Sequence, residues 1–191
     1  MKHTIPEQSA VVPELETRGM HLATGQLKTF FPILQKGVMV PATVGCTLKS
    51  LLCDQLAIPT DYVTDRITTI FVNNRPVDDL EGTIIQDGSR VTLSAAMPGL
   101  VGATMRRGGY YAALRQGISH IVERGAATSQ RGTIRLKLFN LLLAEIGPLI
   151  LAHGLILEQD ELIELLELSP VRAARPAAGS GRVLLTVICN E

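Results

Sequence analysis

The stretch ITTIFVNNRPVDDLEGTIIQDGSRVTLSA, residues 67–95, combines strand-forming and turn-forming segments. Residues 67–73 are mostly apolar or β-branched, and residues 90–95 alternate apolar with polar side chains, so both predict strands. Asn73-Asn74 ends the first segment and Asp87-Gly88 precedes the second, and both pairs favour tight turns. The stretch therefore predicts two strands connected by turn-rich chain.

The residues before this stretch add a predicted helix and two further predicted strands. Leucines recur at helical spacing within residues 47–56, and either Thr43 or Thr47 is suited to cap that helix. Residues 27–34 hold a concentrated apolar set, and residues 38–42 form a short apolar run after a Lys-Gly turn, so both predict strands. The predicted order is strand, strand, helix, strand, strand.

Three segments of this region resemble the ubiquitin-like β-grasp sulfur carriers of the MoaD/ThiS family. They are Gly45-Cys46-Thr47-Leu48-Lys49-Ser50-Leu51-Leu52, Phe71-Val72-Asn73-Asn74-Arg75-Pro76-Val77 and Gln86-Asp87-Gly88-Ser89-Arg90-Val91-Thr92-Leu93. Their order is similar to the helix start, the end of a central strand and the approach to the last strand in that family. The resemblance covers about residues 27–99 and implies a ubiquitin-like β-grasp domain, so the expected fold class is α+β.

The resemblance also implies a chemistry and a kind of partner. In the family, a partner enzyme adenylates the carboxylate of a C-terminal diglycine, which is converted to a thiocarboxylate and threaded into a sulfur-accepting enzyme. Glycine suits such a tail because it has no side chain to obstruct a narrow channel. Here the nearest diglycine, Gly108-Gly109, lies inside the chain. Carrier activity would therefore require proteolysis after Gly109.

The segment around this diglycine is rich in glycine and arginine. Its candidate functional residues are Gly99, Gly102, Arg106, Arg107, Gly108 and Gly109. Three interpretations are open: a loop whose glycines satisfy turn geometry, a mobile or cleavable tail, and an anion site built from backbone N–H groups and arginines. The segment has neither the GxGxxG nor the Walker spacing of phosphate-binding loops.

The C-terminal half shows apolar periodicity without a recognised resemblance. It predicts helices at residues 110–122, 141–146, 149–157 and 160–168, a loop at 172–182, and strands at 132–140 and 182–189 that we expect to pair. The predicted domains are a flexible arm (1–23), the β-grasp domain (24–100), a linker (101–111) and a smaller α+β extension (112–191). We expect residues 24–100 to fold independently.

The 18 basic and 18 acidic side chains among 191 residues give a formal net charge of zero, which argues against a dedicated nucleic-acid binder. The charges are nevertheless segregated. Residues 106–137 hold seven basic groups and one acid, and residues 138–168 hold six acids and no Lys or Arg. The two blocks are either solvated faces of opposite sign or pair with each other, within one chain or between subunits. We predict that the leucine-rich region 138–168 forms a homo-oligomer interface, with the basic block near the acidic helix.

Neither a membrane span nor secretion is predicted. The most apolar stretch, residues 138–157, contains Asn140, Glu145 and Gly147-Pro148, which are costly or helix-interrupting in hydrocarbon. The first residues show no signal-peptide pattern. Three cysteines without CxxC spacing indicate reduced thiols, so we expect a cytoplasmic protein.

Catalytic and metal-binding patterns are not found in the sequence. The four histidines are far apart, no HExxH or GxSxG motif occurs, and His153 lies in an apolar stretch that favours a satisfied core or interface histidine. Cys46 and Cys53 are predicted to be small buried residues, Cys189 has no predicted base beside it, and the acidic residues at 78, 79 and 81 are predicted to be a solvated face. We expect no enzyme activity, cofactor or metal.

Two functional hypotheses result. In the first, the protein is a non-enzymatic interaction or oligomerisation module related to sulfur carriers, with the diglycine chemistry lost. In the second, it is a sulfur-carrier precursor activated at Gly109 after proteolytic removal of the C-terminal extension, and its partners are adenylating or sulfur-accepting enzymes.

Overall fold

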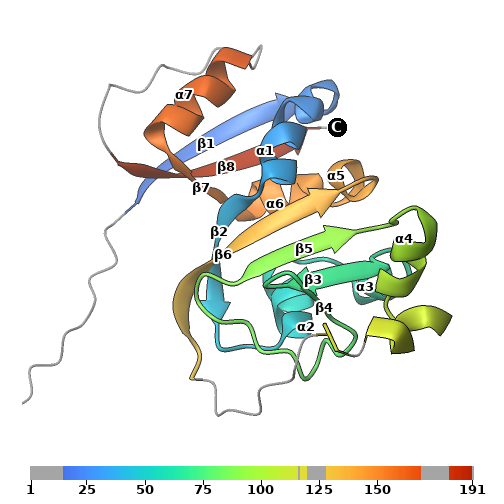
Figure 1. Ribbon diagram of the computed structural model, residues 1–191. Helices are drawn as coiled ribbons and strands as arrows, with labels where there is room; N and C mark the ends of the chain where they lie inside the picture. Colours follow the sequence, from blue (N-terminus) through green and yellow to red (C-terminus); the bar gives the residue numbers. More distant parts are fainter. Residues whose placement is uncertain (1–14, 116, 120–127, 169–180, 191) are drawn as a thin grey trace, which may run out of the picture.

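A computed structural model describes residues 15–115, 117–119, 128–168 and 181–190, and shows a mixed α/β protein built on one eight-stranded sheet (Figure 1). The strands are β1 (Glu16–Ala23), β2 (Val38–Val44), β3 (Thr69–Val72), β4 (Arg75–Pro76), β5 (Arg90–Ser94), β6 (Gln130–Phe139), β7 (Leu155–Glu158) and β8 (Arg182–Asn190). The α-helices are α1 (Phe31–Lys36), α2 (Leu48–Ser50), α3 (Thr60–Asp65), α4 (Gly99–Met105), α5 (Leu142–Glu145), α6 (Gly147–His153) and α7 (Gln159–Leu168). Two 3₁₀ helices, η1 (Thr24–Phe30) and η3 (Tyr110–Arg115), and the π-helical turn η2 (Leu51–Gln55) complete the described elements.

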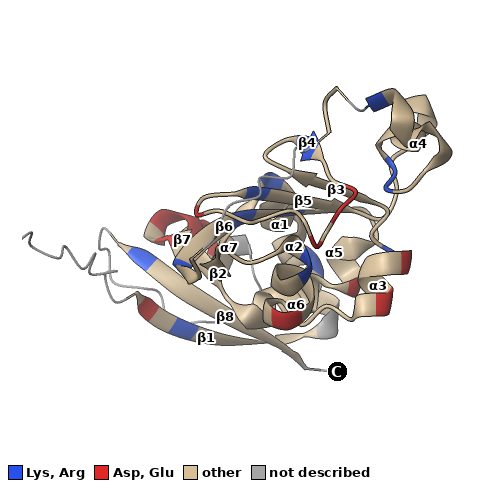
Figure 2. Cartoon of the chain, turned by 90° about the horizontal axis from the view of Figure 1, so that it is seen from below, with Lys and Arg blue, Asp and Glu red and all other residues tan. Residues whose placement is uncertain are grey.

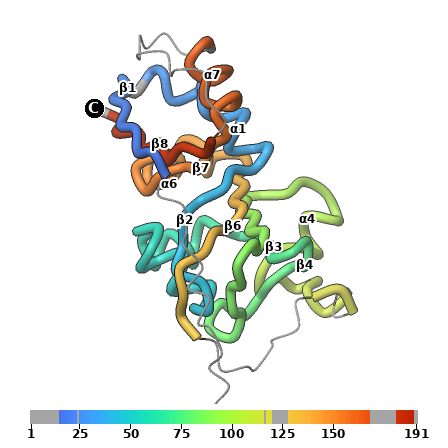
Figure 3. Tube along the Cα trace, turned by 90° about the vertical axis from the view of Figure 1, so that its left-hand side faces the viewer, coloured from blue at the N-terminus to red at the C-terminus, as the bar shows by residue number. Residues whose placement is uncertain are grey.

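The strand order is β1-β8-β7-β2-β6-β5-β3-β4. The β1–β8 and β5–β6 pairs are parallel, and the other neighbouring strands are antiparallel. Figure 3 shows β2 and β6 running through the middle of the molecule, with β1, β8 and β7 to one side and β3 to the other. Segments from both halves of the chain therefore alternate within one sheet.

Strand β6 is the central element of this arrangement. It pairs with β2 on one edge, from Val38 opposite Leu136 to Val44 opposite Gln130, and with β5 on the other. Its inward side chains Ile134, Leu136 and Leu138 have no exposed surface. The predicted boundary at residue 100 therefore has no counterpart in the sheet, because β6 from the C-terminal half separates β2 from β5.

The predicted turn at Asp87-Gly88 holds β6 in place. The Gly88 N–H donates to the carbonyl oxygen of Thr133 at 2.8 Å, and the Thr133 N–H donates to Asp87 Oδ1 at 2.8 Å. Gly88 has a positive φ of 73°, which glycine adopts without strain. The turn that the sequence indicated thus also anchors a strand more than forty residues later.

Several local predictions are confirmed. Strands β2, β3, β5, β6 and β8 lie where the strand patterns predicted them, and α7 lies where the last amphipathic helix was predicted. Thr47 caps the helix that follows it, since its hydroxyl accepts a hydrogen bond from the Ser50 N–H at 3.1 Å.

The prediction of a strand at residues 27–34 is wrong, because this segment forms η1 and α1. Its fully or nearly buried side chains are Leu27, Phe30 and Leu34, which recur at intervals of three and four residues and so share one helical face. Pro32 stands in the first turn of α1, where its missing N–H would have no intrahelical partner. The prediction used the high apolar content of residues 27–34 but not the helical spacing of their apolar side chains.

The prediction of a flexible arm over residues 1–23 is wrong for its last part. Residues 16–23 form β1, which pairs in parallel with β8 and buries alternate residues Met20 and Leu22. The remainder of the predicted arm, residues 1–14, lies outside the described residues.

The C-terminal half departs from prediction in three places. β6 and β8 do not pair with each other, because β7 and β2 lie between them. Residues 155–157 belong to β7 rather than to a helix, since Gly154, with a φ of 116°, ends α6. The helix predicted over 110–122 is the shorter η3, and both its final residues and most of the predicted 172–182 loop lie outside the described residues.

Most leucines of the region 138–168, on which the predicted oligomer interface rested, are buried within this chain, and oligomerisation itself stays a prediction. Leu138, Leu142, Leu151, Leu155 and Leu162 are all within 1% of complete burial. The described part of the chain contains no helix that is both long and apolar enough to cross a membrane.

Candidate functional site

The six candidate residues between 99 and 109 lie together at one end of the sheet, where the chain leaves β5. Residues 99–105 form α4, in which Gly102 is buried against the preceding loop. A Cβ atom at Gly102 would overlap the carbonyl oxygen of Met97, so only glycine fits this contact. The first part of the predicted linker is therefore a packed helix.

Gly108-Gly109 forms a turn and is not an extended tail. Gly108 has a φ of 61°, and the Gly109 N–H donates to the Arg106 carbonyl oxygen at 3.2 Å. The Gly108 N–H donates to Asp78 Oδ1 at 3.2 Å. The diglycine is thus hydrogen-bonded to its own segment and to the loop after β4.

Arg107 ties this turn to the chain around α3. Its N–H donates to the Thr68 carbonyl oxygen at 2.8 Å, and its Nη2 donates to the carbonyl oxygens of Val63 and Thr64 at 2.7 and 3.1 Å. Burial lowers the pKa of the guanidinium, and Nη1 is buried without a hydrogen-bond partner. The guanidinium thus has a structural role in docking the segment.

Arg115 is a second anchor, and the sequence analysis did not single it out. Only 3% of it is exposed, although it lies among the otherwise exposed side chains of η3. Its Nη2 donates to Asp78 Oδ1 at 2.7 Å, its Nε to the Thr104 carbonyl oxygen at 2.7 Å, and its Nη1 to Ser119 Oγ at 3.0 Å. Arg115 therefore joins η3 to α4 and to Asp78, which also holds the diglycine turn.

The acidic residues after β4 are engaged by the protein. Besides Asp78, Asp79 accepts from the N–H groups of Glu81 and Gly82 at 3.0 and 2.8 Å, and Glu81 pairs with Lys49 at 2.6 Å. The prediction of a solvated acidic face is confirmed, because all three side chains are exposed and their hydrogen bonds and ion pairs lie at the surface. The anion-site interpretation is weakened, because Asp78 takes the Gly108 N–H and the carbonyl oxygens of Val63 and Thr64 take Arg107 Nη2.

Replacing Arg115 by methionine should lower the free energy of unfolding by about 2–3 kcal/mol, because three acceptors lose a charged donor in a buried site. Urea denaturation followed by circular dichroism measures the change. Arg106, an exposed arginine of the same segment, provides the matched control, and Arg106→Met should change stability by less than about 0.5 kcal/mol. Equal effects of the two substitutions would contradict the anchoring role.

Helix α4, η3 and the turn after η3 carry a group of exposed apolar side chains, which we call the α4–η3 patch. The contacts of Arg107 and Arg115 hold these elements in place. The members of the patch are Leu100, Val101, Tyr110, Tyr111, Leu114 and Ile118, with exposed fractions from 43% for Tyr111 to 93% for Tyr110. The two tyrosine rings make an edge-to-face contact, with centroids 5.1 Å apart. Apolar side chains of this size are normally buried, so their grouping here sets this surface apart.

A groove of about 710 Å³ lies beside β2, where β7 turns away after a single pairing of Met39 with Ile156. Side chains bond the backbone groups of β2 that β7 leaves unpaired. The Gln55 amide accepts from the Thr43 N–H at 2.7 Å and donates to the Thr43 carbonyl oxygen at 2.9 Å, as a neighbouring strand would. Pro41 has no N–H, and its carbonyl oxygen lies 2.9 Å from His153 Nε2. These contacts satisfy the strand edge.

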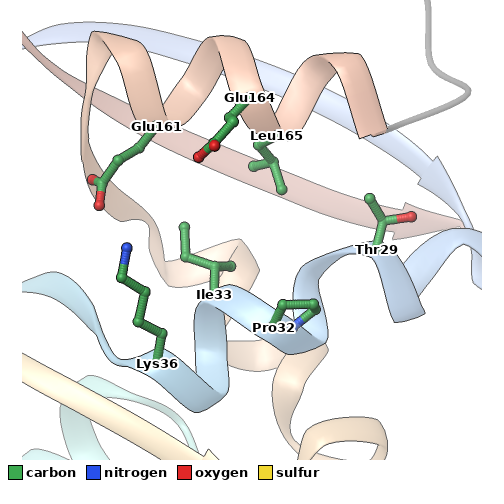
Figure 4. A pocket seen from close by; sticks show the side chains of 7 residues that line it. All are labelled: Thr29, Pro32, Ile33, Lys36, Glu161, Glu164 and Leu165. Atoms are coloured by element: carbon green, nitrogen blue, oxygen red, sulfur yellow. The ribbon is translucent and has the colours of Figure 1, made fainter.

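A smaller pocket of about 140 Å³ lies between α1 and α7 (Figure 4). Lys36 projects from α1 toward Glu161 on α7, and Ile33 and Leu165 line the apolar part between them. Pockets for drug-sized molecules usually exceed about 300 Å³, so this one is a shallow seam between helices.

The described cysteines and histidines form no catalytic arrangement. Burial raises the pKa values of the Cys46 and Cys189 thiols, which disfavours their nucleophilic thiolate forms. Cys46 Sγ also donates to the Thr43 carbonyl oxygen at 3.1 Å, and all three cysteines are partly buried. His153 makes the satisfied internal contact that the sequence predicted. No group of three or more His, Cys, Asp or Glu residues within the described ranges could hold a metal ion.

Glu145 makes one long-range polar link, between α5 and the α3 region. It accepts from the hydroxyl of Tyr62 and from Arg66. The Tyr62 hydrogen bond, followed by that of Arg66, holds the pKa of the Glu145 carboxyl below its ordinary value of 4.5. Burial, together with the Glu145 carboxylate, raises the pKa of Tyr62, which therefore stays a donor.

This link predicts a pH-dependent contribution to stability. Because the folded-state pKa of Glu145 is depressed, its stabilisation is complete above the ordinary value of 4.5 and is lost as pH falls through the lower folded value. The Tm difference between the wild type and Glu145→Gln should therefore shrink as pH decreases below that range. Thermal melts of the two proteins at a series of pH values measure the difference, and a difference that stays constant with pH would contradict this contribution of Glu145.

Comparisons with protein-family models, with curated proteins and with solved structures found no match to this chain.

Proposed function

We propose that this chain is a non-enzymatic protein-interaction module, related in fold to the β-grasp sulfur carriers, in which Gly108-Gly109 is a structural turn instead of a reactive tail. The observation that carries this proposal is the central position of β6, between β2 and β5. The folded turn at the diglycine and the α4–η3 patch support it further.

The relation to the β-grasp fold is supported by part of the sheet. Strands β2, β6, β5, β3 and the short β4 are neighbours in that order, and the helix α2–η2 lies between β2 and β3 in the chain. In a β-grasp sheet the first strand lies in the middle, antiparallel to the second strand and parallel to the last. Here β6 has those partners, antiparallel β2 and parallel β5, so we interpret the connectivity as a circularly permuted β-grasp.

The same placement argues against the carrier-precursor alternative. Cleavage after Gly109 would leave an N-terminal piece without β6, and therefore without the strand that joins β2 to β5. Ile134, Leu136 and Leu138 would no longer fill its core. A carrier must present a flexible tail on a folded domain, whereas this cleavage would divide the sheet that supports the tail.

The α4–η3 patch supplies the positive support for an interaction role. The Arg115–Asp78 ion pair and the Arg107 contacts hold the patch in place before any partner binds. Preorganised surfaces lose less conformational freedom on binding, which favours affinity.

Two measurements on the protein in its native cell test the proposal. Mass spectrometry should find the Gly109–Tyr110 peptide bond intact and Gly109 without sulfur. A photo-crosslinking amino acid at Leu114 should capture a protein, whereas the same amino acid at Leu141, a comparably exposed leucine elsewhere, should not. A fragment that ends at Gly109 with sulfur in place of one oxygen would overturn the proposal in favour of the carrier, and absence of crosslinking at Leu114 would overturn the interaction role.

A further inference from the structure

Exposed apolar side chains are concentrated in one place on this molecule. Eight large apolar side chains among the described residues are exposed to solvent, and six of them belong to the α4–η3 patch. The other two, Leu141 and Ile188, lie singly elsewhere, and scattered single residues of this kind are ordinary. The grouping of exposed apolar side chains therefore distinguishes the patch from the rest of the described surface.

The patch contains no free acidic group, and its buried arginine is already paired. Residues 99–119 include no Asp or Glu, and the α4 region in Figure 2 accordingly carries no red. Arg107 and Arg115 direct their guanidinium groups to protein acceptors beneath the patch. A partner can therefore cover the patch without desolvating an unpaired carboxylate, and Arg106 is the one arginine of residues 99–119 that is exposed.

We propose that the partner of the α4–η3 patch is a second copy of this chain, in a twofold dimer that packs patch against patch. This inference rests on the proposed function and specifies its partner. In a twofold interface the same surface is used by both subunits, so an apolar patch meets an apolar patch. The formal net charge of zero means that two copies approach without net electrostatic repulsion.

The size of the patch fits a stable dimer. Six side chains with these exposures present on the order of 700 Å² of surface, given that a large aromatic side chain contributes about 150–250 Å² when fully exposed. A standard interface takes about 800 Å² from each partner. Tyr110, with 93% of its surface exposed, is of the residue type enriched at interface centres.

The first test is the oligomeric state of the full chain. Sedimentation velocity from about 1 to about 100 μM, a range that covers ordinary micromolar dissociation constants, should show a dimer. Leu114→Asp should raise the dimer dissociation constant by about 30-fold or more, because it places a charge in the apolar contact. Leu141→Asp, the same change at an exposed leucine outside the patch, should leave the constant unchanged.

The second test locates the contact independently of any disruptive variant. The chain contains no tryptophan, so Tyr110→Trp introduces a single reporter at the most exposed position of the patch. Its emission should shift to shorter wavelength over the same concentrations at which the mass doubles, because dimerisation removes the indole from water.

Three results would overturn the dimer. They are a monomer mass throughout the concentration range, a dimer that Leu141→Asp weakens as much as Leu114→Asp, and a doubling of mass without a change in tryptophan emission. The proposed function fails separately. A monomer whose Leu114 crosslinks to a different protein rejects the dimer alone, whereas a sulfur-bearing fragment ending at Gly109 rejects the interaction module itself.

Discussion

A fragment of residues 1–109 should not show a cooperative thermal unfolding transition, although the full chain should. The fragment lacks β6, so β2 and β5 lose their shared neighbour and both present unpaired backbone groups. It also lacks Ile134, Leu136 and Leu138, which are completely buried in the intact protein. Thermal melts followed by far-UV circular dichroism would measure this difference, which is the largest effect that we predict.

The control for this experiment is co-expression of the fragment with residues 110–191. The missing strand is then supplied by a second chain, and the two pieces should copurify and unfold cooperatively together. If the fragment 1–109 instead folds alone, the predicted independent domain of residues 24–100 is supported, and the carrier precursor becomes the better functional hypothesis.

Replacing Phe30 by alanine should lower the free energy of unfolding by about 3–5 kcal/mol, the usual cost of truncating a buried phenylalanine. Phe30 has no exposed surface and ends η1, in the segment where the sequence predicted a strand. The substitution leaves a cavity in the core beneath α1 that its neighbours can fill only in part. Urea denaturation at constant m-value measures the loss.

Phe31 provides a matched control because it carries the same side chain one residue further along and is only partly buried against the core. Phe31→Ala should therefore cost clearly less than Phe30→Ala. Equal costs, or a larger cost at Phe31, would contradict the helical face formed by Leu27, Phe30 and Leu34.

The candidate segment shows how far residue types alone indicate a role. The glycines and arginines between 99 and 109 stand out in the sequence, and the structure brings them together in α4 and the following turn. The roles of Arg115 and Asp78 were missed because they lie 37 residues apart and meet only in the folded chain. One feature of the sequence could have indicated the role of Arg115, namely that it is the one charged residue of the mostly apolar segment 110–118.

The sequence by itself determined the short-range features of this protein. The Thr47 cap, the Asn73-Asn74 and Asp87-Gly88 turns, and the alternation in β5 and β6 each depend on a few neighbouring residues. Asn73 and Asn74 indeed adopt positive φ values of 51° and 66°, which asparagine tolerates better than most residues. Such features can be predicted from the sequence because the same few residues that form them also stabilise them.

Only the tertiary structure decided which strands are neighbours. Backbone hydrogen bonds between strands are the same for any sequence, so the alternation in β6 shows that one face is buried without showing which edges it meets. Likewise, the apolar residues 27–34 supply enough hydrophobic surface for a strand or a helix, and packing against the core selects the helix. The insertion of β6 between β2 and β5 therefore depends on long-range burial, which no local pattern in this sequence encodes.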